Sequence, residues 1–327
     1  MKKSIIFFLV TVLILVGCQN STLKERDHNS LDPGQTNNKD SNDADVNSEK
    51  YVTTTKNEKG QLFHVISAYK WVNQYVEKTK DTDSESERSE LWKKIVMDNI
   101  QDQCLSGEYS HLVKEYVSTP PGNLENLKRD VGILNSSNLE EATIEALEAS
   151  AKILPGPETT VCLLPRGDKV NFLGVNLDAG KISIFNSPSQ NESILKSTIA
   201  HEYHHSTWTA KYSDNYNWDL LGDIIFEGKA EYFASLVFEQ SVANNMNAEQ
   251  EKRLWSKVKD SLYSTNRDEI NTVLYGGRND FPYIYGYLLG YQIVSEYVEN
   301  HPEATTEEWS KLSPKELYEK SGYEDSL

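Results

Sequence analysis

Three residues near the middle of the chain have the types and the spacing of a metal-dependent catalyst. His201, Glu202 and His205 form an H-E-x-x-H motif. On a helix, a four-residue step is about one turn, so both imidazoles project from one face and can reach one ion. Neutral imidazole nitrogens suit Zn²⁺ in a tetrahedral site. Glu202 is then placed to act as a general base on a water in the open position, and His204 is expected to pack or to face solvent.

A catalytic zinc site needs a third protein ligand, and an acidic pattern downstream offers candidates. Asp219, Asp223, Glu227 and Glu231 recur at four-residue steps in the otherwise mostly apolar segment 218–233. Such carboxylates repel one another, and their burial costs desolvation energy unless a cation or imidazoles face them. The pattern therefore favours a metal-binding helix. A solvated acidic edge on an amphipathic helix is the alternative.

The elements that position these residues can be predicted from hydrophobic periodicity. Residues 62–152 have a mostly helical pattern, beginning with Phe63, Ile66 and Tyr69 at three-residue steps. Further helices are expected from about residue 192 through Ile199 and over residues 218–242, 249–262 and 283–299.

Between these helical regions, the sequence predicts short strands. Residues 159–164, 170–177 and 181–185 are apolar and rich in β-branched side chains, and the last two flank a turn at 178–180. We expect a small antiparallel sheet that precedes the H-E-x-x-H helix. The predicted fold class is α+β, predominantly α-helical.

The N-terminus is predicted to be a targeting signal rather than part of the folded domain. Two lysines precede an apolar run from Ile5 to Val16, which is too short to cross a bilayer and suits a secretory signal peptide. Leu15-Val16-Gly17-Cys18 resembles the bacterial lipoprotein box, which predicts cleavage after Gly17 and lipidation of Cys18. An ordinary signal peptide with an incidental cysteine is the alternative.

The remaining composition sets the domain organisation and the partners. Residues 1–17 are the expected signal peptide, residues 18–56 a disordered polar tether, and residues 57–327 one domain. The expected location is the extracytoplasmic face of a cell membrane, in a Gram-positive bacterium, with a lipid anchor. A formal charge of -17 argues against nucleic acid as a partner. Cys104 and Cys162 could pair outside the cell, but the sequence does not set their separation.

The two motifs together resemble those of a known protein class. His201-Glu202-x-x-His205 followed by Glu227-Gly228-x-Ala230-Glu231 resembles the gluzincin zinc metallopeptidases. It is most similar to the YjaZ-type family of predicted zinc-dependent proteases, a family found in bacterial lipoproteins. Gly286–Tyr291 and Ala68–Trp71 also resemble segments of that family. The resemblance implies a zincin-like domain, Zn²⁺ as the cofactor and a peptide or protein as the substrate.

The resemblance also implies residue roles. In gluzincins the glutamate of the second helix completes the metal site, which matches Glu227, and a carboxylate one turn later hydrogen-bonds the first histidine, which matches Glu231. The separation between His205 and Glu227 is slightly longer than the best-known gluzincin spacings, so Glu231 stays open as an alternative ligand. The implied reaction is metal-assisted amide hydrolysis with Glu202 as the general base.

Two further assignments are less constrained by the sequence. An oxyanion donor would be one of four tyrosines, and we select Tyr287 from the set Tyr283, Tyr285, Tyr287 and Tyr291.

The competing function is a non-catalytic surface lipoprotein, for binding or chaperoning, with a structural metal site. Glu202 favours the enzyme, because a structural site has no need of a base beside its histidine.

Overall fold

The computed structural model describes residues 48–214, 216–238 and 247–327. The expected signal peptide, Cys18 and the tether up to residue 47 lie outside these residues. Within the described part of the chain, no helix combines the length and the apolar character that crossing a bilayer requires.

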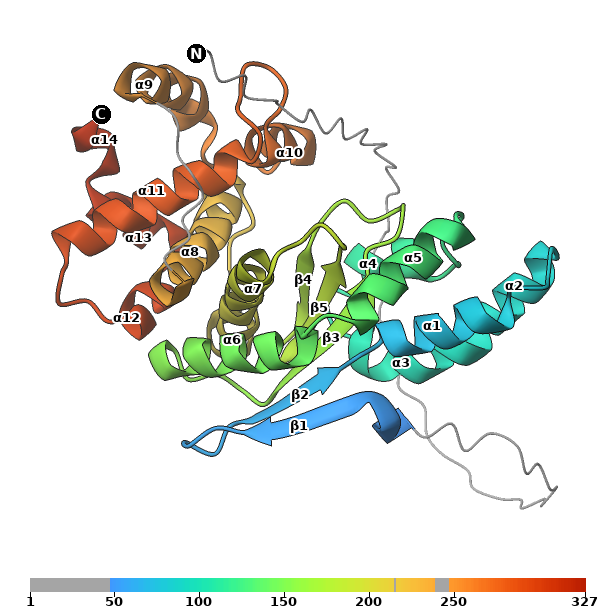
Figure 1. Ribbon diagram of the computed structural model, residues 1–327. Helices are drawn as coiled ribbons and strands as arrows, with labels where there is room; N and C mark the ends of the chain where they lie inside the picture. Colours follow the sequence, from blue (N-terminus) through green and yellow to red (C-terminus); the bar gives the residue numbers. More distant parts are fainter. Residues whose placement is uncertain (1–47, 215, 239–246) are drawn as a thin grey trace, which may run out of the picture. The chain divides into compact units, whose positions relative to one another are not determined.

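The order of elements agrees with an α+β fold that is mostly helical (Figure 1). The strands are β1 (Val52–Lys56), β2 (Leu62–Ile66), β3 (Thr159–Pro165), β4 (Gly174–Asp178) and β5 (Lys181–Asn186). The α-helices are α1 (Tyr69–Lys78), α2 (Glu85–Trp92), α3 (Asp98–Cys104), α4 (His111–Val117), α5 (Leu124–Asn135), α6 (Leu139–Ile153), α7 (Glu192–Tyr212), α8 (Leu220–Phe238), α9 (Ala248–Val258), α10 (Arg267–Tyr275), α11 (Tyr285–Asn300), α12 (Thr306–Lys311), α13 (Pro314–Ser321) and α14 (Tyr323–Ser326). Short 3₁₀ turns are η1 (Ser48–Tyr51) and η3 (Lys259–Ser261), and η2 (Lys93–Met97) is a π-helical turn.

The sheet is mixed, so the prediction of an antiparallel sheet is wrong in this respect. Its strand order is β1-β2-β3-β5-β4. The predicted hairpin between β4 and β5 is antiparallel, but β5 also pairs with β3 in parallel, and β3 pairs with β2 in parallel. β3 and β5 are parallel because the chain runs from β3 to the edge strand β4 and then turns back, which places β5 between them. β2 and β3 are parallel because the helical segment from α1 to α6 connects them.

The N-terminal edge of the sheet is the main departure from the predicted pattern. Phe63 and Ile66 lie in β2, not in a helix, and β2 pairs with β1, which takes up the last residues of the expected tether. The three-residue spacing fits a helix only because it continues across the strand-to-helix junction into Tyr69 of α1. Within β2, Phe63 and Val65 are buried on one face of the sheet and Ile66 on the other, as in a strand.

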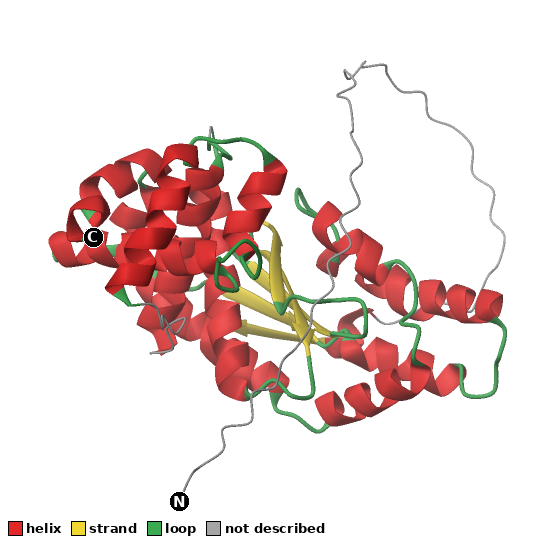
Figure 2. Cartoon of the chain, turned by 90° about the horizontal axis from the view of Figure 1, so that it is seen from above, coloured by secondary structure: helices red, strands yellow, loops and turns green. Residues whose placement is uncertain are grey.

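Helices cover both faces of the sheet and enclose a separate hydrophobic core on each (Figure 2). One core combines α6 through α14 with strand side chains such as Val161 and Ile184. The other combines α1 through α5 with the alternate strand side chains, such as Leu164 and Phe185. The pleat of the strands sends successive side chains into different cores. The helices that carry the two motifs, α7 and α8, both belong to the first core.

A disulfide joins the second core to the sheet. Cys104 at the end of α3 is bonded to Cys162 in β3, with Cα atoms 5.5 Å apart and a sequence separation of 58. Both cysteines are buried. The pairing that the sequence left open is therefore present in the structure.

Candidate metal centre

The first motif lies in the middle of α7, a helix with a well-defined start. The side chain of Asn191 accepts a hydrogen bond from the backbone N–H of Ile194 at 2.8 Å, which satisfies one free donor of the first turn. Two turns further on, His201 and His205 project from the same side of α7. Their Nε2 atoms lie 3.0 Å apart.

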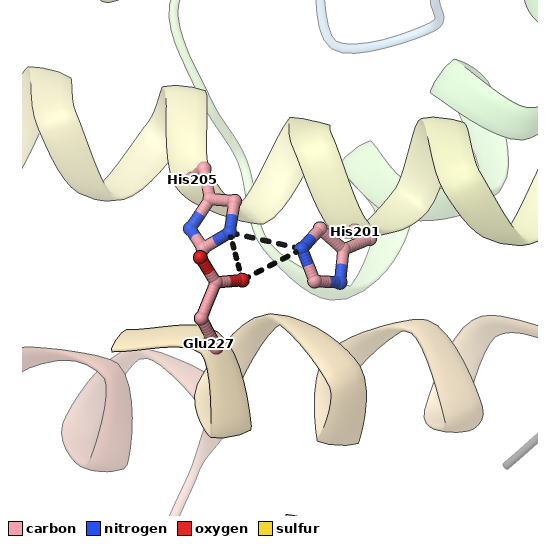
Figure 3. Close-up of side chains that lie close together, drawn as sticks. All are labelled: His201, His205 and Glu227. Atoms are coloured by element: carbon pink, nitrogen blue, oxygen red, sulfur yellow. Dashed lines mark hydrogen bonds and ion pairs between the residues drawn. The ribbon is translucent and has the colours of Figure 1, made fainter. Parts of the chain in front are cut away.

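The second motif brings a carboxylate to the same point. Glu227 on α8 places its Oε2 atom 3.2 Å from Nε2 of His201 and 3.2 Å from Nε2 of His205. Figure 3 shows the three side chains pointing toward one another from the two helices. These residues form the group of potential ligands found among the described residues.

The chemistry of these donors fits a zinc ion. Tetrahedral ligands at about 2.0–2.1 Å from Zn²⁺ lie about 3.3 Å from one another, close to the three separations seen here. Two neutral imidazoles that aim lone pairs at each other and at a carboxylate repel, so a cation or a proton must lie among them. Three protein donors also leave a fourth position for water or substrate, as a catalytic site requires.

Glu231 orients the first histidine. Its Oε1 atom lies 3.1 Å from Nδ1 of His201, on the ring atom that faces away from Glu227. Burial acts to lower the pKa of His201, but the carboxylates of Glu231 and Glu227 outweigh it and hold that pKa well above its ordinary value. In this arrangement Glu231 contacts the histidine, whereas Glu227 contacts both potential ligand nitrogens.

The second histidine is held by an aromatic ring instead. Phe226 stacks on His205 with ring centroids 3.9 Å apart and an angle of 18° between the planes. Nδ1 of His205 is buried and has no hydrogen-bond partner among the described residues. The two metal-facing histidines are therefore positioned by different means, one by a carboxylate and one by stacking.

Glu202 lies beside the three donors but not among them. Its side chain is buried, and the backbone of Asn176 in the edge strand β4 acts to lower its pKa. Burial raises the pKa of the Glu202 carboxyl, in part against the effect of His201 and His205. A carboxyl with a raised pKa is suited to accept a proton and to release it again near neutral pH.

A glycine in β4 makes the space for this carboxylate, and the sequence reasoning missed it. A Cβ atom at Gly174 would lie 2.8 Å from Cγ and 2.9 Å from Oε1 of Glu202. Gly174 falls within the predicted strand 170–177, but no local pattern indicates that it lies against Glu202.

The four carboxylates of the acidic pattern contact different groups. The Asp219 side chain caps the start of α8, accepting from the backbone N–H of Gly222 at 2.8 Å. Asp223 forms an ion pair with Arg267 of α10 at 3.0 Å. Glu227 and Glu231 face the histidines of α7. The pattern therefore marks a helix whose four carboxylates all have polar or charged partners, two of them sharing His201, rather than a solvated edge.

Of the four candidate tyrosines, the structure places Tyr287 at the site. Its ring stacks over that of His201, with centroids 6.2 Å apart and planes 18° apart. Burial raises the pKa of its phenol well above the ordinary value, so the group is a proton donor and not an anion at neutral pH. The side chain of Tyr283 is 66% exposed, Tyr285 is buried in the core against Phe281, and Tyr291 packs against Tyr232.

The position of Tyr287 depends on a close crossing of α8 and α11. A Cβ atom at Gly228 would lie 2.2 Å from the carbonyl carbon of Gly290, and one at Gly290 would lie 2.1 Å from the carbonyl oxygen of Ile224. Only glycine allows the two backbones to approach so closely. Gly228 follows Glu227 directly, so this contact brings the helix of Tyr287 against the metal-binding face of α8.

His204 faces away from the three donors and packs, which is one of its two expected environments. It is 0% exposed, its ring stacks on Trp309 with centroids 5.6 Å apart, and its Nε2 atom lies 3.0 Å from Oγ of Ser310. Burial lowers the pKa of His204 well below its ordinary value, so the imidazole is neutral. Trp309 and Ser310 were not found from the sequence, because no motif surrounds them.

More than half of the chain matches a known protein family. Residues 139–319, more than half of the chain, match a family described as predicted Zn-dependent protease (DUF2268). The chain belongs to this family. The DUF2268 match runs from α6 into α13 and includes both motifs, Tyr287 and Ser310, whereas Ala68–Trp71 lies outside it. No curated protein and no solved structure matches the chain.

Proposed function

We propose that this protein is a zinc-dependent metallopeptidase that hydrolyses peptide bonds. The observation that carries the proposal is a three-donor face formed by His201, His205 and Glu227, with the buried Glu202 carboxylate beside it and not in it. A purely structural site would favour a fourth protein ligand over an adjacent base. The family description as a predicted Zn-dependent protease supports the same reading. We also propose the closer, YjaZ-type relationship, on the two motifs and on the segment Gly286–Tyr291.

In the proposed mechanism, Zn²⁺ when bound would polarise the scissile carbonyl and acidify the attacking water. Glu202 accepts the proton of that water and later passes it to the leaving amine. Glu231 keeps the Nε2 atom of His201 directed at the ion by accepting from Nδ1. The Tyr287 phenol donates to the oxygen that becomes negative in the transition state.

We further propose that Cys18 carries the acyl chains and anchors the protein to the extracytoplasmic face of a Gram-positive cell membrane. The Cys104–Cys162 disulfide supports this location, because disulfides persist in oxidising compartments outside the cytoplasm. Cys18→Ser should abolish acyl labelling and move the protein from the membrane fraction to the soluble one. Unchanged labelling would contradict the anchor.

The decisive experiment measures zinc and hydrolysis on the same protein. The full chain purified in detergent should contain close to one zinc per molecule and should cleave members of a broad peptide library. Glu202→Gln should keep the zinc and the fold while losing about 10²–10⁴-fold in rate, because it cannot accept the proton. Glu192→Gln, an exposed change in the first turn of the same helix, is the matched control and should retain activity.

Two outcomes would contradict the proposal. A full rate in Glu202→Gln would exclude this residue as the base. Bound zinc without hydrolysis of any library peptide would favour the alternative, a binding or chaperone-like lipoprotein with a structural metal site.

A further inference from the structure

The variable positions of the two motifs carry polar side chains that are completely buried. His204 lies between Glu202 and His205 on α7 and is 0% exposed, and Lys229, two residues after Glu227 on α8, is 1% exposed. Burial of an imidazole or an ammonium group is costly unless it is hydrogen-bonded. Both side chains leave their helices on sides that do not face the three metal-facing donors, so their partners lie elsewhere.

Both side chains bond to the same residue, Ser310 in the last turn of α12. Nε2 of His204 lies 3.0 Å from Oγ of Ser310. Nζ of Lys229 donates to the carbonyl oxygen of Ser310 at 2.9 Å and to that of Leu312 at 2.6 Å. Ser310 is itself 0% exposed. One buried serine is therefore hydrogen-bonded to a side chain of each metal-binding helix.

The neighbouring residue reinforces this link. The Trp309 ring stacks on His204 of α7, with planes 16° apart, and it contacts the ring of Tyr232 on α8 edge to face, with centroids 5.8 Å apart. Trp309 is 1% exposed. The short helix α12 is thus fixed against α7 and α8 by two successive residues, one through polar contacts and one through packing.

We propose that Ser310 is a positioning residue of the metal centre, which sets the separation of α7 and α8. That separation determines the 3.2 Å distances from Oε2 of Glu227 to Nε2 of His201 and of His205. The inference rests on the proposed function, since the separation matters for an ion held between the helices. Metal sites tolerate only about 0.2 Å of error in ligand distances. Any sliding of one helix would break a buried hydrogen bond to Ser310.

The test uses the full chain and three measurements. These are the zinc dissociation constant by chelator competition, the visible absorption spectrum of the Co²⁺-loaded protein, and the unfolding midpoint. Ser310→Ala removes only the bond to His204 and should weaken zinc binding about 10-fold, with a changed Co²⁺ spectrum, as for partners that orient metal ligands. His204→Leu should do the same. His204→Gln retains an amide near the Nε2 position and should recover part of the affinity.

The matched control is another buried serine with a single buried hydrogen bond. Ser183 in β5 donates to the carbonyl oxygen of Cys104 at 2.7 Å and faces the core that does not contain α7 and α8. Ser183→Ala should lower the unfolding midpoint while leaving the zinc constant and the Co²⁺ spectrum as in the wild type. This control separates a loss of general stability from a loss of ligand geometry.

An unchanged zinc constant and Co²⁺ spectrum in Ser310→Ala would overturn the inference, and so would equal weakening in Ser183→Ala. Should Ser310→Ala fail to fold, the two His204 variants test the inference in its place. Equal zinc dissociation constants for His204→Gln and His204→Leu would then overturn it. Hydrolysis is scored separately. A wild type that binds zinc and cleaves no peptide would contradict the protease proposal. The ratio of the zinc dissociation constants of Ser310→Ala and the wild type would still test the role of Ser310.

Discussion

Nδ1 of His201 lies 3.1 Å from Oε1 of Glu231, while Nε2 of the same ring faces Glu227. The two carboxylates of α8 therefore contact different nitrogen atoms of the same imidazole. The sequence left open which of them is the third ligand, and this geometry favours Glu227 for the metal and Glu231 for the histidine.

Glutamine substitutions at these two positions should separate their roles. Glu231→Gln should weaken zinc binding about 10–100-fold, because it removes the charge that orients His201 but leaves all three donors. Glu227→Gln should weaken it more, because a ligating carboxylate becomes a neutral amide. Chelator competition on the two variants measures the order. The reverse order would make Glu231 the ligand.

Tyr287→Phe should reduce kcat about 10²–10³-fold with zinc content unchanged, because the variant keeps the ring over His201 but cannot donate to the oxyanion. Rates on a peptide substrate and zinc content from the same preparation test this expectation. Tyr283→Phe removes a phenol from a side chain that is 66% exposed and should have no effect. Equal rates for the two variants would remove Tyr287 from the mechanism.

Removing the disulfide should destabilise the fold without disturbing the metal centre. The bond joins Cys104 and Cys162, which are 58 positions apart in the sequence. A disulfide typically stabilises the folded protein by about 2–4 kcal/mol, because it restricts the unfolded chain. The variant Cys104→Ala/Cys162→Ala should lose this amount in urea unfolding. Its zinc stoichiometry in native conditions should match the wild type, since the disulfide lies in the other core from α7 and α8. Identical unfolding curves would show that the bond contributes nothing.

Asp223 should make the metal-free protein less stable as the pH rises. Burial raises its pKa from 3.8 to about 6, with Arg267 acting in the opposite direction. Between about pH 4 and pH 6 the folded chain then holds more protons than the unfolded chain, so the free energy of unfolding falls with increasing pH. Asp223→Asn cannot ionise and should be more stable than the wild type at pH 7, by about 3 kcal/mol, and equal to it near pH 4.

Urea unfolding in EDTA at both pH values checks the Asp223 prediction. The exposed Asp81→Asn serves as the control and should follow the wild type at each pH. A difference between wild type and Asp223→Asn that does not change with pH would show that this carboxyl does not titrate in the expected range.

The sequence predicts best where local spacing alone determines geometry. The four-residue step of His201 and His205 and the Glu-Gly-x-Ala-Glu segment place donors on helix faces, and the structure brings those faces together. Ser310 could not be found in this way, because its contacts to His204 and Lys229 depend on how α12 packs. The mixed sheet was missed for a related reason. Whether β5 pairs with β3 is a long-range choice that no local pattern records.

The backbone contact between Gly228 and Gly290 makes two distant positions dependent on each other in evolution. A larger residue at either position forces α11 outward and carries Tyr287 away from His201. Related chains should therefore retain glycine at both positions, or change both together along with whatever replaces the tyrosine. Covariation between the two columns of an alignment would be the record of this constraint. The same pair offers a protein engineer a way to widen the site without altering any residue that faces the metal.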